Sequence, residues 1–385
     1  NLNSASVKTI PFEAFTVIQP AKTQAYNFEH IWRQTKEKLY DPGMNGADWE
    51  RLYTTYKRFL PHINNGYDFA EMASELLGEL NVSHTGCRYH APSSSLPVAQ
   101  LGIIPDETYQ GEGIRVAEVL SGGPLDVCKD IKAGSIITSI DGKKIEACAD
   151  YYPMLAGKAG KATRLSIKGE KKEIVVRPIS WGKQEELLYK RWVRRNEHMV
   201  DSLSGGRLAY VHIEAMNAAS FHEFYKNLLS EKNRMRDAVI VDTRHNGGGW
   251  LHNDVCIALS GKAYSRFTPR GKFIGNDPFD RWVKPSCMLV CEDNYSNAHG
   301  TPWLYKEMGI GKLIGAPVPG TMTAVWWENI GQYTFGIPQV GTKDNRGNYL
   351  ENQQLEPDIE CYVTPEDMLR GVDTQIQAAV KELMK

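Results

Sequence analysis

The sequence predicts an α/β protein in which a βαβ core carries an N-terminal helical domain and an inserted β domain. Three changes of pattern along the 385 residues support this class. Apolar residues recur at helical spacing early in the chain, short strands and turns follow, and strands then alternate with helices to the end. We expect an extended leader at 1–27, the helical domain at 28–92, the β domain at 93–181 and the core at 182–385.

The first domain is predicted to be helical because its apolar residues repeat every three or four positions. Phe28, Ile31 and Leu39 show this spacing, and two further apolar stripes follow at 49–59 and 69–80. Turns rich in Asp, Asn, Pro and Gly separate the three stripes. These stripes indicate a packed core.

The second segment consists of short strands joined by tight turns. Its motifs run in the order Ser121–Leu125, Lys132–Ile137, the hairpin signal Asp141-Gly142, a helix at 150–155 and a strand at 165–167. This order resembles a PDZ domain, whose sheet edge takes up an extended peptide as an added strand. The sequence leaves open whether this groove is accessible or the unit is only a spacer.

The last domain alternates strands and helices. Its strand at 238–242 is almost continuously apolar, as expected for a sheet that is covered on both faces. Further strands are expected at 208–213, 288–291 and 312–315, and helices at 185–200, 219–229, 251–259 and 298–308.

Bulk composition narrows the functional classes. There are 45 basic and 46 acidic residues, and a net charge of −1 gives no general attraction to nucleic acid or to anionic membranes. No stretch approaches the ~18 apolar residues that span a bilayer. The seven cysteines form no C-x-x-C pair and favour reduced core thiols over disulfides or a zinc site. The absence of an initiator Met at Asn1 suggests a processed protein or a fragment.

A glycine-rich turn, Asn246–Gly249, follows the buried strand and precedes a helix. Its backbone amides are suited to holding an anion at a helix N-terminus. A phosphate loop would need a G-K-[ST] sequence, whereas Trp250 follows here. An oxyanion hole for acyl transfer is the other use, and by itself the motif is more typical of a packing turn.

A serine, Ser296, lies between the end of one predicted strand and the start of the next helix. Local context alone favours a helix N-cap. However, the glycine turn and the serine turn both follow strands of one sheet, so a carbonyl held between them would meet a nucleophile and amide donors together.

A serine nucleophile needs a base, and the sequence offers ten histidines. His84 follows the third helix in a short polar turn, while His245, His252 and His299 are nearer to the other two motifs in sequence. His245 and His252 with Asp254 lack metal-ligand spacing, so we interpret these histidines as solvated or supporting residues, with His299 on a helix surface.

Taken together, the motifs resemble those of the tricorn-type serine peptidases, which are relatives of the carboxyl-terminal processing peptidases. The resemblance extends over essentially the whole chain from Phe28 and implies a crotonase/Clp-protease-like core. The matching motifs are, in order, Tyr40–Trp49, Ser83-His84, Asp242–Gly249, Ser296 and Leu350–Asp358.

The resemblance implies a serine endopeptidase or tail-processing peptidase that acts through an acyl-enzyme. Ser296 would be the nucleophile and His84 its base, and Glu351 would act through Ser83 to complete a Ser-His-Ser-Glu tetrad. Backbone amides near Gly248 and Asn297 would hold the oxyanion. It implies no metal and no cofactor, and its partner would be a peptide or unfolded protein.

Several positions depart from the family pattern. Asn297 stands where the family usually has aspartate, and Gln354 replaces a typical glycine. Thr321 occupies the place of the lysine that processing peptidases use as their base, which favours histidine here. The region between the glycine turn and the nucleophile holds Arg266 and Arg270 and no acid from 255 to 276, which argues against a trypsin-like preference.

Two other functions compete with this one. Asn297 allows a catalytically inactive homologue that binds peptides through the PDZ-like domain, and the sheet with its glycine turn allows a crotonase-like acyl-CoA enzyme. The sequence leaves open the cleavage preference, a homo-oligomeric state and the compartment, whether cytoplasm or bacterial periplasm. It also leaves open whether a β-propeller region, common in such families, precedes residues 1–27.

Overall fold

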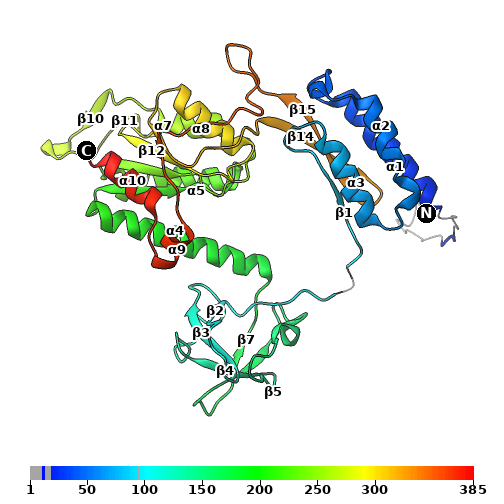
Figure 1. Ribbon diagram of the computed structural model, residues 1–385. Helices are drawn as coiled ribbons and strands as arrows, with labels where there is room; N and C mark the ends of the chain where they lie inside the picture. The colour runs from blue at the N-terminus through cyan, green and yellow to red at the C-terminus, as the bar shows by residue number, and fades with distance from the viewer. Residues whose placement is uncertain (1–10, 14–18, 94) are drawn as a thin grey trace, which may run out of the picture. The chain divides into compact units, whose positions relative to one another are not determined.

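The computed structural model describes residues 11–13, 19–93 and 95–385, which pack into two compact units (Figure 1). The first comprises the chain through Ala91 together with Gly320–Gln353. The second comprises Pro92–Pro319 and Gln354–Lys385. Residues 320–353, which we expected in the core at 182–385, therefore fold with the N-terminal helices.

The first unit packs helices against a small antiparallel sheet. Its helices are α1 (Pro20–Lys38), α2 (Trp49–Lys57) and α3 (Gly66–Gly78), with 3₁₀ turns η1 (Met44–Gly46) and η2 (Leu60–His62). Its strands lie in the order β1 (Cys87–Tyr89), β15 (Tyr333–Gly341) and β14 (Thr323–Ile330). Phe28, Phe69 and Phe335 are at most 1% exposed, so the predicted helical stripes meet the sheet in one core.

Helix α1 begins earlier than the sequence indicated. It starts at Pro20, so the extended leader predicted at 1–27 is wrong over residues 20–27. The fixed φ of proline suits the first turn of a helix, and the Ala, Lys and Gln residues that follow are good helix formers. Residues 11–13 have no regular secondary structure, and residues 1–10 and 14–18 of the leader lie outside the described part of the chain.

In the second unit, the region predicted as PDZ-like forms one antiparallel sheet. Its strands are β2 (Ile103–Pro105), β3 (Ile114–Val119), β4 (Ile136–Ile140), β5 (Lys143–Lys144), β6 (Thr163–Ile167) and β7 (Ile174–Val176), in the order β2-β3-β4-β6-β7 with β5 beside β4. The helix predicted at 150–155 is instead the 3₁₀ turn η3 (Tyr152–Leu155). Asp150 accepts the Tyr152 N–H at 3.0 Å, which holds the preceding residues in a turn.

The remainder of the second unit is an α/β layer structure (Figure 1). Its parallel sheet has the order β16 (Ile359–Glu360), β13 (Lys312–Gly315), β12 (Ser286–Val290), β9 (Ala238–Asp242) and β8 (Leu208–His212). Its helices are α4 (Trp181–Ser204), α5 (Ala218–Leu228), α6 (Glu231–Arg234), α7 (His252–Leu259), α8 (Asn297–Glu307), α9 (Pro365–Arg370) and α10 (Thr374–Leu383). A hairpin, β10 (Ser265–Phe267) and β11 (Gly275–Asp277) around η4 (Pro269–Gly271), was not expected from the sequence.

The parallel sheet is covered on both faces, which accounts for the apolar run in β9. Val239 and Val241 pack in the cluster that includes α5, α7 and α8, whereas Ala238 and Ile240 pack in the cluster that includes α4 and α10. Because β9 and β12 are parallel neighbours, their carboxyl ends place the glycine turn and the serine turn at the same edge of the sheet.

The seven cysteines all lie within the described residues and are free thiols; four of them are buried. Within the described ranges, no helix combines the length and the apolar character needed to cross a membrane.

Candidate active site

Ser296 lies in a sharp turn between β12 and α8. Its backbone has φ 57° and ψ −123°, a combination that costs a non-glycine residue on the order of 1–3 kcal/mol. The residue occupies the N-cap position, yet its side chain makes no capping hydrogen bond to the described helix backbone. A strained strand-to-helix turn of this kind is the geometry that presents a nucleophilic serine at the end of a sheet.

The glycine turn approaches this serine so closely that only glycine fits at Gly248. A Cβ on Gly248 would lie 2.6 Å from the Cβ of Ser296, 2.6 Å from the Tyr295 carbonyl oxygen and 3.0 Å from the Asn297 nitrogen. Its φ of +97° also favours glycine. The structure therefore brings three sequence-predicted residues, Ser296, Gly248 and Asn297, side by side.

The two predicted oxyanion donors differ in their hydrogen bonds. The Gly248 N–H donates to Asn246 Oδ1 at 2.8 Å, so an incoming oxyanion would compete with the Asn246 side chain for it. Asn297 is the first residue of α8, where backbone amides carry the positive end of the helix dipole.

The side chain of Asn297 has a separate, structural task. Its Oδ1 accepts the N–H groups of Leu251 at 2.7 Å and His252 at 2.9 Å, at the start of α7, and its Nδ2 lies 2.8 Å from His252 Nδ1. The residue is 1% exposed. Replacement of the usual aspartate by asparagine therefore keeps both accepted bonds and adds a donor toward His252.

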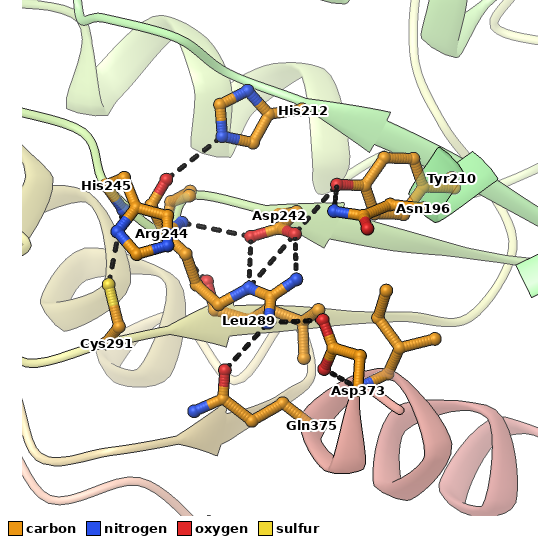
Figure 2. Close-up of polar contacts among 12 residues, drawn as sticks. Asn196, Tyr210, His212, Asp242, Arg244, His245, Leu289, Cys291, Asp373 and Gln375 are labelled. Atoms are coloured by element: carbon orange, nitrogen blue, oxygen red, sulfur yellow. Dashed lines mark hydrogen bonds and ion pairs between the residues drawn. The ribbon is translucent and has the colours of Figure 1, made fainter. Parts of the chain in front are cut away.

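A buried ion pair between Arg244 and Asp242 precedes the glycine turn in the chain (Figure 2). Arg244 binds the Asp242 carboxylate with its Nε and Nη2 and reaches Asp373 at 2.9 Å and Gln375 at 2.8 Å with Nη1. Tyr210 also donates to Asp242 at 2.8 Å. Although burial favours the neutral acid, Arg244 keeps the pKa of Asp242 below its ordinary value. These contacts tie the turn to α10, and no sequence motif indicated the partners at 373 and 375.

The predicted base lies in the first unit, in a chain of polar side chains. Ser83 Oγ lies 2.7 Å from His84 Nδ1 and donates to Glu351 Oε2 at 3.1 Å, while the Ser83 N–H donates to Glu351 Oε1 at 2.6 Å. Glu351 is 4% exposed and His84 is 9% exposed. The structure thus brings Ser83, His84 and Glu351 together from segments some 270 residues apart in sequence.

This chain of hydrogen bonds favours one imidazole tautomer. Because the Ser83 hydroxyl proton is directed to the carboxylate, its oxygen is left to accept the proton on His84 Nδ1. Nε2 then carries the lone pair and is the basic nitrogen. His84 has φ 64°, and its carbonyl packs so closely on Gly336 that a Cβ there would lie 2.2 Å away.

Thr323 also belongs to this cluster and was not predicted from the sequence. Its Oγ1 lies 3.0 Å from His84 Nδ1 and 3.1 Å from Ser83 Oγ. It begins β14, two residues after Thr321, which we considered only as the replacement for a lysine. Nothing in the local sequence distinguishes it from an ordinary strand threonine.

Burial shifts the protonation of the cluster toward neutral forms. Desolvation lowers the pKa of His84 to about 4. Burial also raises the pKa of Glu351 above its ordinary value, although hydrogen bonds from Ser83 and the Met322 backbone act in the opposite direction. Near neutral pH, His84 therefore remains an uncharged imidazole that is able to accept a proton.

The rival histidines have other environments. His245 is exposed and His252 contacts Asn297, consistent with supporting positions. The expectation that His299 lies on a helix surface is wrong: it is 1% exposed, because the first half of α8 is buried on every side. Its Nδ1 has no hydrogen-bond partner among the described residues.

Comparison with protein families agrees with this organisation. The Tricorn protease C1 domain matches residues 20–78, the Tricorn protease PDZ domain matches 110–180, and Peptidase family S41 matches 207–361. The order is the one expected from the sequence: helical, PDZ-like and then catalytic.

Curated relatives match along almost the whole chain. Tricorn protease of Thermoplasma acidophilum is 24% identical over 374 residues, covering 93% of this chain and 34% of its own length. Tricorn protease homolog 1 of Streptomyces coelicolor is 25% identical over 381 residues, covering 94% and 35%. The chain spans less than half the length of the curated relatives it matches.

Solved structures show the same fold. The crystal structure of the tricorn protease superposes with a TM-score of 0.84 at 23% identity, covering 95% of this chain and 37% of that one. Mature CPAF gives a TM-score of 0.51 at 12% identity, covering 95% and 96%. The predicted fold class, with its helical domain, PDZ domain and peptidase core, is confirmed.

The fold and the domain order are those of a peptidase with a family S41 core. Within this class, the chain is similar to the tricorn proteases, which it matches in the C1 domain, in the PDZ domain and along 93% of its length in the curated relative from Thermoplasma acidophilum.

Proposed function

We propose that this chain is the catalytic segment of a serine endopeptidase or tail-processing peptidase, with Ser296 as nucleophile and His84 as base. The observation that carries the proposal is the buried carboxylate–hydroxyl–imidazole chain of Glu351, Ser83 and His84. Such a chain fixes one imidazole tautomer, which matters for a base and has no evident structural use.

In the proposed reaction, Ser296 Oγ attacks the scissile carbonyl carbon while its proton passes to His84 Nε2. The tetrahedral intermediate collapses, and His84 returns this proton to the leaving amine, so that an acyl-enzyme ester remains. Water then attacks the ester with His84 again as base, and the product carboxylic acid leaves Ser296. Every proton taken by His84 is returned within the cycle.

The developing oxyanion would be held by the N–H groups of Gly248 and Asn297. Each such donor contributes typically about 3–4 kcal/mol to the stability of the transition state. The Asn297 amide lies at the start of a helix and supplies the more direct donor, whereas Gly248 must exchange its bond to Asn246 for one to the substrate.

Glu351 and Ser83 are proposed as positioning residues. The carboxylate holds the Ser83 hydroxyl, and this hydroxyl accepts the Nδ1 proton, so the imidazolium formed during attack is stabilised through one intervening bond. Thr323 Oγ1 offers a second acceptor at 3.0 Å from the same nitrogen.

The substrate is proposed to be a peptide or an unfolded segment of protein, docked by the PDZ domain.

The division of the chain into domains at 28–92, 93–181 and 182–385 stays a proposal, in which residues 320–353 belong to the first compact unit. The alternative of an inactive peptide binder rested on Asn297, and its side chain is accounted for by its two bonds to the start of α7.

Hydrolysis of fluorogenic peptides and of an unfolded protein such as casein tests the proposal. Ser296→Ala and His84→Ala should each abolish turnover, whereas the exposed control replacements Ser202→Ala and His222→Ala should leave it unchanged. Full activity of Ser296→Ala would refute the assignment. Peptide binding without turnover by the unaltered protein would favour the inactive binder.

A further inference from the structure

Three side chains of the types that ligate metals meet beside the glycine and serine turns. A ring nitrogen of His245, Cys291 Sγ and a carboxylate oxygen of Asp293 all lie within 4.8 Å of one another. As a metal ligand, His245 was weighed from the sequence only with His252 and Asp254, because its actual neighbours lie 46 and 48 residues away in the chain. We propose that His245, Cys291 and Asp293 bind one zinc ion.

The chemistry of the three donors suits this ion. Zinc accepts thiolate, imidazole and carboxylate ligands in tetrahedral geometry, and three protein ligands leave the fourth position to water. His245 Nδ1 already lies 2.9 Å from Asp293 Oδ2, and Cys291 Sγ donates to Asp293 Oδ1 at 2.6 Å. On binding, the thiol proton leaves to solvent and the ion replaces both hydrogen bonds.

The ligand atoms need to move little. Bond lengths of about 2.0–2.3 Å from zinc place tetrahedral ligands roughly 3.3–3.8 Å apart. The hydrogen-bonded atoms lie 2.6 and 2.9 Å apart, so the carboxylate must draw back by less than about 1 Å to admit the ion. The side chains of His245 and Asp293 are 58% and 59% exposed, so both are able to rotate toward an ion. Cys291 is 4% exposed and provides the fixed member of the set.

The backbone holds the sulfur and the imidazole in position. His245 adopts φ 63°, an unusual conformation for histidine, and its N–H donates to Cys291 Sγ at 3.2 Å (Figure 2). Asn294 Oδ1 lies 3.1 Å from the same sulfur. The Trp192 ring meets the imidazole edge-on at 5.8 Å between centroids. These contacts orient the ligands before any ion arrives.

The site is accessible to an ion. A cavity of about 270 Å³ is lined by His245 and Cys291, together with Glu292 and Arg195. The exposed carboxylate of Asp293 faces the imidazole from the serine turn. A bound ion would join the residue three positions before Gly248 to the residue three positions before Ser296, and so would link both turns. Binding itself does not depend on the proposed peptidase reaction.

The full chain is first treated with a chelator to remove bound metal. Titration with Co²⁺ under reducing conditions then tests the proposal. We expect a thiolate-to-cobalt charge-transfer band that saturates at one equivalent and disappears on addition of Zn²⁺. The band should be lost in Cys291→Ala, and binding should weaken at least about 10-fold in His245→Ala and in Asp293→Asn. Cys148→Ala and His222→Ala, at exposed positions, are the matched controls and should bind as the unaltered protein does.

Absence of the charge-transfer band, or an unchanged band in Cys291→Ala, would overturn the proposal. Circular dichroism checks that Cys291→Ala is folded. If Cys291→Ala does not fold, the cobalt affinities of His245→Ala and Asp293→Asn decide the question, because both positions are exposed and their replacement should leave the fold intact. Unchanged cobalt affinity in both would then overturn the proposal.

Discussion

Replacement of Gly248 by alanine should inactivate the protein while it stays folded. The added Cβ would lie 2.6 Å from both the Ser296 Cβ and the Tyr295 carbonyl oxygen, and backbone atoms on both sides must separate to relieve this. A left-handed φ alone costs alanine roughly 1–2 kcal/mol of folding stability. The larger effect is on the reaction, because the amide of Gly248 and the nucleophile are displaced relative to each other. Loss of one oxyanion donor lowers kcat about 10²–10³-fold.

Gly309→Ala is the matched control. Gly309 also has a positive φ, +61°, and belongs to the same compact unit, but it is exposed and a Cβ there would meet nothing within 4 Å. Gly309→Ala should therefore lose roughly 1–2 kcal/mol in denaturant unfolding from its φ alone, Gly248→Ala should lose more because of the overlap, and only Gly248→Ala should lose activity on a fluorogenic peptide. If Gly248→Ala keeps kcat within about threefold of the unaltered protein, the close approach of the two turns has no role in the reaction.

Three further predictions concern the polar groups around the site. Glu351→Gln should lower kcat roughly 10²-fold, less than the about 10⁴-fold seen where the acid contacts the imidazole directly, since Ser83 intervenes; an unchanged kcat in steady-state assays would refute this. Because burial lowers the pKa of His84 to about 4, kcat/KM should stay level as pH falls from 8 to about 5 and decline only near 4, whereas a decline centred at 6.5 would contradict the assignment. The free energy of unfolding should also fall as the pH drops below about 6.5, because His84 in the unfolded chain binds a proton near pH 6.5, whereas in the folded protein it binds one only near pH 4. Asn297→Ala should destabilise the protein by about 1–3 kcal/mol in denaturant titration, because two amides of α7 lose their acceptor, while Asn297→Asp should cost less.

The sequence was sufficient where local chemistry decides structure. The apolar run 238–242 indicated a sheet covered on both faces, and β9 is buried throughout. The glycine turn and Ser296 follow neighbouring strands, so their meeting at one sheet edge was predictable from the order of the elements. The helical stripes at 49–59 and 69–80 correspond to α2 and α3.

Features that depend on distant partners were not predictable. Thr323 joins the His84 cluster only because β14 folds with the N-terminal helices, and the strand's own pattern does not reveal this. Arg244 finds Asp373 and Gln375 some 130 residues later, and His245 finds Asp293 48 residues later. His299 is buried because neighbouring elements enclose the start of α8, a matter of tertiary packing that helical periodicity does not encode.

The rate at which a fluorophosphonate labels Ser296 tests most directly whether this hydroxyl is activated by His84. Mass spectrometry of digested protein identifies the labelled residue, and the time course gives the second-order rate constant. We predict labelling at Ser296 alone, slowed at least about 100-fold in His84→Ala and unchanged in His222→Ala. Labelling that spares Ser296, or that proceeds equally fast without the imidazole of His84, would contradict the account.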